Sequence, residues 1–161
     1  MEVERKFLIK NIPFNLENYK HKEIEQSYIS YEPETRLRKL NDKYYLTKKS
    51  NGTLIREEDE KVISNELYNE LIINRLNNTI MKRRYYIPYN DLLIEFDIYK
   101  GILEGLMVAE IEFDSIEESK KFIIPSWFYK EVTDNTNFKN KNLSLINSKN
   151  IDNFKELMNE Q

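Results

Sequence analysis

Charged and apolar residues alternate in several segments of this chain, and this two-residue period is the feature that most constrains its fold. Side chains of an extended strand point alternately to its two faces, so charged residues two positions apart share a face. At the N-terminus, Glu2, Glu4 and Lys6 therefore lie opposite Val3 and Phe7. The same spacing recurs in order at Arg36/Arg38, Arg56/Glu58/Glu60, Lys82/Arg84, Glu95/Asp97 and Glu110/Glu112. A lone amphipathic strand shows its charged face to water, but this recurrence predicts a fold that gathers the charged faces together.

Length and composition predict one globular domain spanning residues 1–161. Hydrophobic residues make up 40% of the chain and charged residues 33%, which allows a real core. The absence of cysteine excludes a disulfide framework, cysteine zinc sites and thiol catalysis. No apolar run approaches the roughly 20 residues that span a bilayer, and the charged N-terminus does not resemble a signal peptide. We therefore expect a cytoplasmic protein without a membrane partner, and the net charge of −3 gives no reason to expect nucleic acid binding.

The pattern along the chain predicts eight strands, one helix between them and helices after them. The predicted strands are the N-terminal segment and residues 24–31, 35–40, 43–49, 53–62, 79–87, 92–99 and 105–113. Ser64 is a suitable N-cap for a helix over residues 64–78, Ser115 opens a short helix, and residues 151–158 form another. These elements predict an α+β fold, an eight-stranded antiparallel β-barrel with helices packed outside.

The two faces of the predicted strands indicate which side lines the barrel. In residues 93–98, Ile94 and Phe96 share the face opposite Glu95 and Asp97. An ordinary barrel turns its apolar face inward. Here the 64–78 helix and the C-terminal helices could cover the apolar faces from outside, which would leave the charged faces to line a tunnel.

A charged interior predicts a charged ligand. The basic residues of the predicted inner face are Lys6, Arg36, Arg38, Lys49, Arg56, Lys82 and Arg84, and the acidic ones are Glu2, Glu4, Glu58, Glu60, Glu95, Asp97, Glu110 and Glu112. Burying so many isolated charges would cost far more than a domain's net stability of about 5–15 kcal/mol. Arginine and lysine suit phosphate oxygens, and clustered carboxylates suit Mg²⁺ or Mn²⁺. Both sets together predict a polyphosphate bound with a metal, which we expect at Glu2/Glu4 and Glu110/Glu112.

Several motifs in order carry a resemblance to a known family. The segment Glu2-Val3-Glu4-Arg5-Lys6 resembles the ExExK signature of the CYTH superfamily, also called triphosphate tunnel metalloenzymes. Further matching motifs are Gln26 and Tyr28, Arg36-Leu37-Arg38, Thr47-Lys48-Lys49, Arg56 to Glu60, Lys82-Arg83-Arg84-Tyr85, Glu95-Phe96-Asp97, Ala109 to Phe113 and Lys130 to Thr133. The resemblance covers nearly the whole chain and is strongest to the bacterial inorganic tripolyphosphatases. It implies an eight-stranded tunnel and metal-dependent chemistry on triphosphates.

The resemblance also implies roles for individual residues. The triphosphate-binding set would be Lys6, Arg36, Arg38, Lys49, Arg56, Lys82 and Arg84. The metal set, for Mg²⁺ or Mn²⁺, would be Glu2, Glu4, Glu110 and Glu112. Glu58, Glu60 and Asp97, with Lys6, would form the catalytic set by positioning a second metal or the attacking water. Alternation favours Lys49 over Lys48 as the inward lysine, although a one-residue slip would reverse them.

The function expected from these residues is metal-dependent hydrolysis of inorganic tripolyphosphate, a small-molecule substrate, to pyrophosphate and phosphate by a metal-activated water. Thiamine triphosphatase and class IV adenylate cyclase stay open, because the phosphate-binding residues do not identify what is attached to the third phosphate. A noncatalytic polyphosphate- or nucleotide-binding module is an alternative of another class. A homodimer is also left open.

A few conspicuous residues have simpler interpretations. We expect Gln26 and Tyr28 to satisfy hydrogen bonds within the tunnel wall, His21 to lie in a loop, and Trp127 to serve packing. Tyr129 stands where the family motif favours a small residue, which predicts altered packing of the C-terminal plug.

Overall fold

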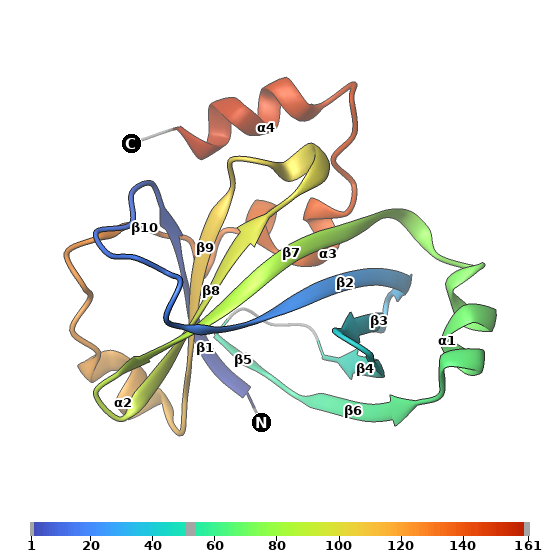
Figure 1. The fold of residues 1–161 in the computed structure, drawn as a ribbon, viewed down its shortest axis with the longest axis horizontal. Coiled ribbons are helices and arrows are strands. Elements are labelled where there is room, and N and C mark those ends of the chain that lie inside the picture. Colours follow the sequence, from blue (N-terminus) through green and yellow to red (C-terminus); the bar gives the residue numbers. More distant parts are fainter. Residues whose placement is uncertain (1, 51–53, 160–161) are drawn as a thin grey trace.

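The structure is a computed structural model and describes residues 2–50 and 54–159, without the side chain of Arg56. Its strands are β1 Glu2–Ile9, β2 Lys20–Tyr31, β3 Glu34–Leu40, β4 Lys43–Lys49, β5 Ile55–Arg56, β6 Glu58–Ile63, β7 Leu76–Tyr89, β8 Leu92–Tyr99, β9 Met107–Phe113 and β10 Phe128–Glu131. The helices are α1 Asn65–Ile72, α2 Ile116–Lys121, α3 Asn140–Leu143 and α4 Ile151–Met158, with single 3₁₀ turns η1 at Gly101–Leu103 and η2 at Thr136–Phe138 (Figure 1). None of these helices is long and apolar enough to cross a membrane.

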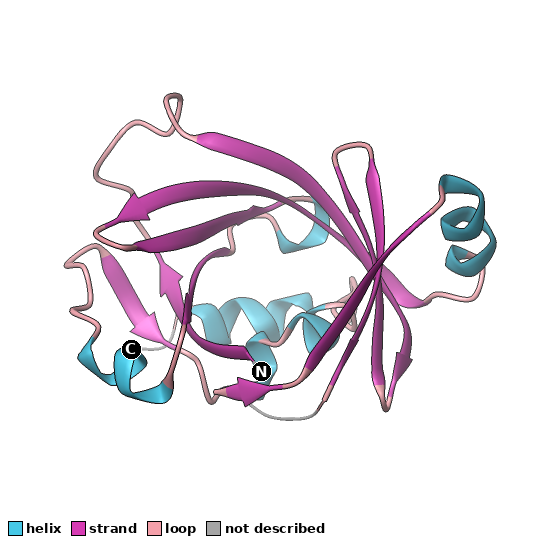
Figure 2. Cartoon of the chain, turned by 90° about the horizontal axis from the view of Figure 1, so that it is seen from below, coloured by secondary structure: helices cyan, strands magenta, loops and turns pink. Residues whose placement is uncertain are grey.

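One antiparallel sheet contains all the described strands. Its order is β10-β1-β9-β8-β7-β2-β3-β4-β6, and β5 pairs separately with β1. The end strands β10 and β6 do not pair, but β5 leads directly into β6, so the chain brings this end of the sheet back to β1. Figure 2 shows how strongly the strands twist and curl. The predicted α+β antiparallel fold is confirmed.

The predicted strand count and closure need correction. The expected strand over residues 53–62 is divided into β5 and β6, which pair with different neighbours, and β10 is an additional strand beside β1. Residue 53 lies outside the described residues. The barrel is therefore a curled sheet of more than eight strands that hydrogen bonds do not fully close.

The strand register brings the charged faces together, as alternation predicts. Lys6 of β1 lies opposite Glu110 of β9, and Glu110 lies opposite Glu95 of β8. Toward the other end of the strand order, Lys49 of β4 lies opposite Glu58 of β6. The register thus aligns the charged residues of neighbouring strands on one face of the sheet.

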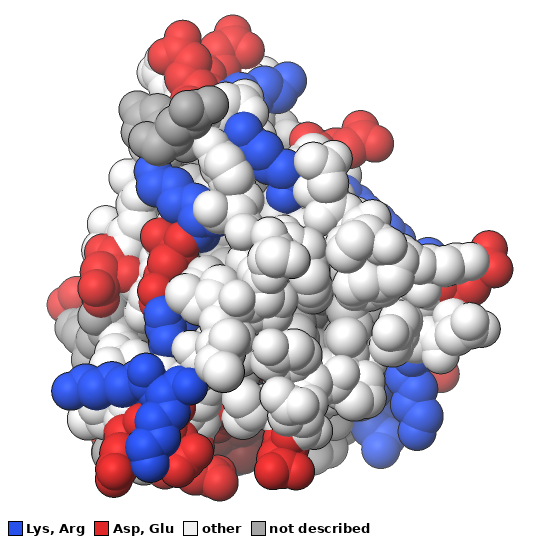
Figure 3. All heavy atoms as spheres, turned by 90° about the vertical axis from the view of Figure 1, so that its left-hand side faces the viewer, with Lys and Arg blue, Asp and Glu red and all other residues white. Residues whose placement is uncertain are grey.

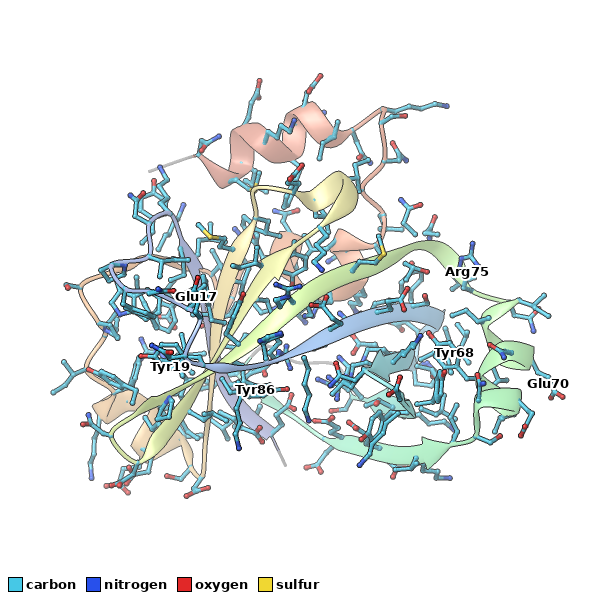
Figure 4. The ribbon with its side chains drawn as sticks, in the orientation of Figure 1. Glu17, Tyr19, Tyr68, Glu70, Arg75 and Tyr86 are labelled. Atoms are coloured by element: carbon cyan, nitrogen blue, oxygen red, sulfur yellow. The ribbon has the colours of Figure 1, made fainter. Side chains whose placement is uncertain are left out.

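Helix α1 is shorter than the predicted 64–78. Ser64 is its N-cap, because the side-chain oxygen accepts a hydrogen bond from the Leu67 backbone N–H at 3.0 Å. The helix ends at Ile72 and β7 begins at Leu76, followed by Asn77 with a φ of 58°, a left-handed conformation that an α-helix cannot contain. Tyr68 points toward the sheet and packs against Tyr44 with ring centroids 4.8 Å apart and the ring planes tilted by 51°, whereas Glu70 points away (Figure 4).

The apolar face of β1, β8 and β9 is covered from outside. Val3, Phe7, Ile94 and Ile111 belong to one buried cluster, which we call the outer cluster, and residues of the 10–19 connection and the segment after α2 pack against it. Uncharged side chains gather in a broad area on this side of the molecule, with charged ones around it (Figure 3).

The C-terminal helices α3 and α4 lie at one end of the charged face, not over the outer apolar face. Along β1, β8 and β9 the charged face becomes apolar, at Leu8, Tyr99 and Val108. These residues form a second buried cluster, the end cluster, with Phe138, Leu143 and Phe154 of the C-terminal segment. The apolar side chains of this segment are buried there because the inner face offers them an apolar surface.

Candidate active site

A cavity of about 250 Å³ lies against the charged face of the curled sheet. Its lining residues are Glu2, Glu4, Lys6, Tyr28, Glu34, Arg36, Arg38, Lys49, Glu58, Glu60, Arg84, Glu95, Glu110, Glu112, Lys139 and Asn140. Only Tyr28 and Asn140 among them are uncharged. The alternating charges of the sequence therefore do line one internal space.

Eleven of the residues predicted for the site line this cavity: Glu2, Glu4, Lys6, Arg36, Arg38, Lys49, Glu58, Glu60, Arg84, Glu110 and Glu112. Lys49 lines it and Lys48 is exposed, in agreement with the favoured register. Lys82 and Asp97 do not line it: they share strand faces with Arg84 and Glu95, but both are almost completely buried. The side chain of Arg56 lies outside what the structure describes.

Five lining residues were not among the predicted site residues. Glu95 was on the predicted inner face without a role, and Glu34 and Tyr28 share faces with Arg36 and Gln26, so alternation gave a signal for them. Lys139 and Asn140 come from the C-terminal segment, which has no two-residue period. The sequence carried no signal that this segment reaches the cavity.

Arg36 and Arg38 form the basic part of the wall on β3. Arg38 contacts Glu60 at 3.2 Å and Arg36 contacts Glu58 at 4.0 Å. The Nε groups of both arginines are buried, and neither has a hydrogen-bond partner among the described residues. Burial, together with the positive charges of Arg36 and Arg84, lowers the pKa of Arg38 to about 10, so it remains charged at neutral pH. Two clustered, incompletely paired guanidinium groups favour an anion.

The side chain of Gln26 does not make the hydrogen bonds within the wall that we expected, as far as the described residues show. It is fully buried on β2, opposite Arg38, yet both its amide oxygen and its amide nitrogen lack a partner in the described part of the chain. The hydroxyl of Thr47 on β4 is in the same situation. Unpartnered polar atoms thus occur on three neighbouring strands of this wall.

Carboxylates crowd the opposite wall on β1, β8 and β9. Glu4 lies directly opposite Glu112, and Glu95 directly opposite Glu110, an arrangement that is destabilising without a cation. Burial and the negative charges of Glu110 and Glu2 raise the pKa of Glu4 to about 7. Burial and Glu2 likewise raise the pKa of Glu112. For Glu110, burial is outweighed by Lys6 and Arg84, which hold its pKa below the usual range.

The donor chemistry of this wall fits a hard divalent cation, although the described residues form no preassembled metal site. Among the described residues, no three Asp, Glu, His or Cys side chains converge on a common metal position. Mg²⁺ typically uses only one or two protein carboxylates and completes its shell with waters and substrate phosphates. Paired carboxylates beside an anion site meet this requirement.

A buried ion-pair network of Arg84, Asp97 and Lys82 supports the wall of the cavity. Arg84 donates two hydrogen bonds to Asp97, at 2.7 and 2.9 Å, and one to Glu95 at 3.0 Å. The Lys82 ammonium lies 2.7 Å from Asp97. Although burial opposes ionisation, Arg84 and Lys82 hold the pKa of Asp97 below its usual value, and burial lowers the pKa of Lys82 to about 8. The network fixes the guanidinium of Arg84 at the cavity.

Lys6 connects the cavity with the C-terminal segment. Its ammonium lies 3.6 Å from Glu110 and donates to the backbone oxygen of Phe138 at 3.1 Å. Its backbone N–H donates to the Thr133 hydroxyl at 3.0 Å, and its backbone oxygen accepts from Val132 at 2.8 Å. The C-terminal segment is therefore fixed to the strand that carries the acidic wall.

Two known proteins with similar sequences are both described as inorganic triphosphatases. No family model matches the chain. The chain is 36% identical over 149 residues to an inorganic triphosphatase of Nitrosomonas europaea, covering 89% of this chain and 97% of that protein. It is 33% identical over 146 residues to an inorganic triphosphatase of Acetivibrio thermocellus, covering 88% and 92%.

Among solved structures, the inorganic triphosphatase NE1496 matches with a TM-score of 0.68 at 32% identity, over 91% of this chain and 96% of the other. HpAC1 from Hippeastrum, described as a putative adenylyl cyclase with a dominant triphosphatase activity, matches in fold with a TM-score of 0.59 at 17% identity, over 74% and 83% of the two chains. The order of motifs, the charged cavity and these relatives lead to one assignment: the chain belongs to the inorganic triphosphatases of the CYTH, or triphosphate tunnel metalloenzyme, superfamily.

Proposed function

We propose that this protein is a hydrolase that cleaves inorganic tripolyphosphate to pyrophosphate and phosphate. The observation that carries the proposal is the cavity that Arg36 and Arg38, whose buried Nε groups have no hydrogen-bond partner among the described residues, line together with a row of carboxylates. A triphosphate carries many anionic oxygens for the basic wall, and a cation bound with it would relieve the acidic wall. The relatives' description as inorganic triphosphatases supports the same substrate.

The cation in this proposal is Mg²⁺ or Mn²⁺, held by Glu2, Glu4, Glu110 and Glu112. A bound divalent cation would neutralise phosphate charge and activate water. The opposed carboxylates of Glu4 and Glu112 support this assignment, since a cation bound beside them would relieve their mutual repulsion. The choice between the two metals stays a prediction.

The residues of the chain would act mainly by positioning and charge neutralisation, as phosphoryl transfer requires. The proposed phosphate-binding set is Lys6, Arg36, Arg38, Lys49 and Arg84, with Arg56 as a further prediction. Several of their present ion pairs are long, such as Lys49 to Glu2 at 3.4 Å and Arg36 to Glu58 at 4.0 Å. Long pairs of this kind exchange readily for shorter, charge-assisted contacts to phosphate.

Glu58 and Glu60 would orient the water that attacks the terminal phosphorus, while the bridging oxygen leaves with pyrophosphate. Lys82 and Asp97 are proposed to support the site through Arg84, because neither lines the cavity. This differs from the direct roles that the sequence resemblance implied for them.

The alternatives are less well supported. Adenylate cyclase and thiamine triphosphatase act on substrates with an aromatic group beyond the phosphates, and among the described residues Tyr28 is the one aromatic side chain that lines this cavity. A noncatalytic binding module gives no reason for a wall of opposed carboxylates next to the phosphate site. A cytoplasmic location, a homodimer, and the lack of nucleic acid and membrane partners stay predictions.

The test is phosphate release by the purified protein with Mg²⁺ or Mn²⁺ from tripolyphosphate, thiamine triphosphate and ATP in parallel. We expect a strong preference for tripolyphosphate, abolished by EDTA. Glu4→Gln should lose the activity, whereas Glu117→Gln, on the exposed surface of α2, should keep it. Tight tripolyphosphate binding without turnover would refute the enzyme and favour the binding module, and cyclic AMP from ATP would favour a cyclase.

A further inference from the structure

Asn140 is an uncharged residue in a cavity that is otherwise almost entirely charged. It is the first residue of α3 and lines the cavity next to Lys139. The backbone on either side of it is well anchored: Phe138 and Leu143 are buried in the end cluster, and the Phe138 oxygen accepts a hydrogen bond from Lys6. The C-terminal segment therefore presents the Asn140 side chain to the cavity from a fixed position.

The orientation of the Asn140 amide is set by a buried tyrosine. Tyr99 is 2% exposed, and its hydroxyl donates to Asn140 Oδ1 at 2.8 Å. The ammonium of Lys82 lies 3.5 Å from the same hydroxyl. An ammonium can only donate, so the tyrosine oxygen accepts there and its single hydrogen goes to the amide oxygen.

This leaves the amide nitrogen of Asn140 as a donor. Within the described residues it has no hydrogen-bond partner in the protein, and the side chain's hydrogen bond to Tyr99 is made by its oxygen. The amide group is planar, so fixing Oδ1 against Tyr99 also fixes the direction of the two N–H bonds. A neutral donor is suited to this place, since it can bind an anionic oxygen without adding a charge beside Lys6 and Arg84.

We propose that Asn140 is a substrate-contacting residue whose amide nitrogen donates a hydrogen bond to the terminal phosphate at the end of the cavity nearest the C-terminal segment. Tyr99 is the positioning residue that selects this amide orientation. The inference rests on the proposed function, in which a triphosphate occupies the cavity. It assigns to the C-terminal segment a part in substrate recognition as well as in packing.

The first test is Asn140→Asp, which keeps an oxygen acceptor for Tyr99 and replaces the amide donor by a carboxylate oxygen. Loss of a hydrogen bond to a charged group predicts a fall in kcat/KM for tripolyphosphate of about 10- to 100-fold. The matched control is Asn153→Asp on the exposed surface of α4, which makes the same change in net charge away from the cavity and should leave kcat/KM unchanged. Thermal unfolding of each variant shows whether it is folded, and Asn140→Ala serves if the aspartate variant is not.

The role of Tyr99 is tested by a double-mutant cycle. Tyr99→Phe should raise KM several-fold in the wild-type background and have no further effect in Asn140→Ala, because the hydroxyl acts through Asn140. A tyrosine with a merely structural role would have the same effect in both backgrounds, which would overturn its positioning role. Kinetics of both Asn140 variants that match the control, with an active wild type, would overturn the proposal while leaving the proposed function intact. A wild-type protein that neither binds nor cleaves tripolyphosphate would overturn both.

Discussion

Replacing Asp97 by asparagine tests the buried ion-pair network of Asp97, Arg84 and Lys82. Asp97 is 0% exposed, and it compensates both Lys82, 2.7 Å away, and the bidentate Arg84. Asparagine has almost the same shape but no charge, so Asp97→Asn leaves Lys82 buried beside a neutral acceptor and leaves Arg84 hydrogen-bonded to one carboxylate, Glu95, instead of two. Removing one partner of a buried ion pair costs about 3–5 kcal/mol, because the remaining charge is still desolvated.

This free energy converts into a large shift of the thermal midpoint. An unfolding entropy of about 2.1 cal/mol/K per residue, applied to 161 residues, gives about 0.34 kcal/mol/K for the chain. A loss of about 3–5 kcal/mol therefore lowers Tm by about 9–15 °C. Circular dichroism melting at pH 7 measures the shift, and urea unfolding gives the free energy independently. Asp91→Asn, in the exposed turn between β7 and β8, is the matched control and should melt with the wild type.

The pH dependence of the difference identifies its cause. Arg84 and Lys82 hold the pKa of Asp97 below its usual value despite burial, so the ionised carboxylate stabilises the folded state above its unfolded pKa of about 3.9. This contribution is lost as pH falls below that value through the folded pKa. The wild type should therefore approach the variant in Tm at acid pH, because the variant has no carboxylate to protonate.

Two outcomes would refute this reasoning. A Tm of Asp97→Asn within about 3 °C of wild type at pH 7, which corresponds to about 1 kcal/mol, would mean that the network contributes little. A difference independent of pH down to acid denaturation would mean that the variant loses packing rather than charge compensation. Conversely, Lys82→Met in the Asp97→Asn background should recover part of the loss, since it removes the buried cation that has lost its ion-pair partner.

Three further predictions concern the metal, the anion site and the fold. At limiting Mg²⁺, Glu4→Gln and Glu112→Gln should each lose at least about tenfold of the tripolyphosphatase activity and recover part of it at excess metal; metal titrations that overlay the wild type would contradict the assignment. Arg38→Lys keeps the charge but loses the guanidinium fork, so kcat/KM should fall about tenfold or more with Tm little changed. Ser64→Ala removes the N-cap of α1 and should cost about 1 kcal/mol, or about 3 °C in Tm, with activity unchanged.

Alternation predicted most strands closely because one face of each strand is in the charged interior and the other against an apolar layer. The predicted segments 43–49 and 92–99 coincide with β4 and β8, and the predicted 151–158 helix coincides with α4. The end of α1 was missed because Leu76 fits the helical spacing, whereas the left-handed Asn77 that follows it depends on the tertiary course of the chain. Strand β10 has only four residues, too few for a period to be recognised.

For the site, the period predicts the face of a residue but not its depth. Arg84 and Lys82 share a face of β7, yet Arg84 lines the cavity, whereas Lys82 is buried and does not line it. The difference depends on where the C-terminal segment closes the charged face, and that segment is placed by long-range packing of Phe138 and Phe154. The same packing brings Asn140 to the cavity, which no local pattern in the sequence could predict.

The two apolar clusters explain how the fold can be stable despite a charged interior. The outer cluster lies behind the sheet and the end cluster closes one end, so neither depends on the charged side chains of the cavity. The interior is then free to be arranged for a ligand, even where opposed carboxylates such as Glu4 and Glu112 reduce the stability of the protein alone. It follows that a ligand which relieves this repulsion must stabilise the fold by its binding free energy, and the stabilisation grows with the logarithm of ligand concentration above Kd. In this family member, the opposed carboxylates of the cavity therefore reduce the stability of the free chain and contribute to that of its complex.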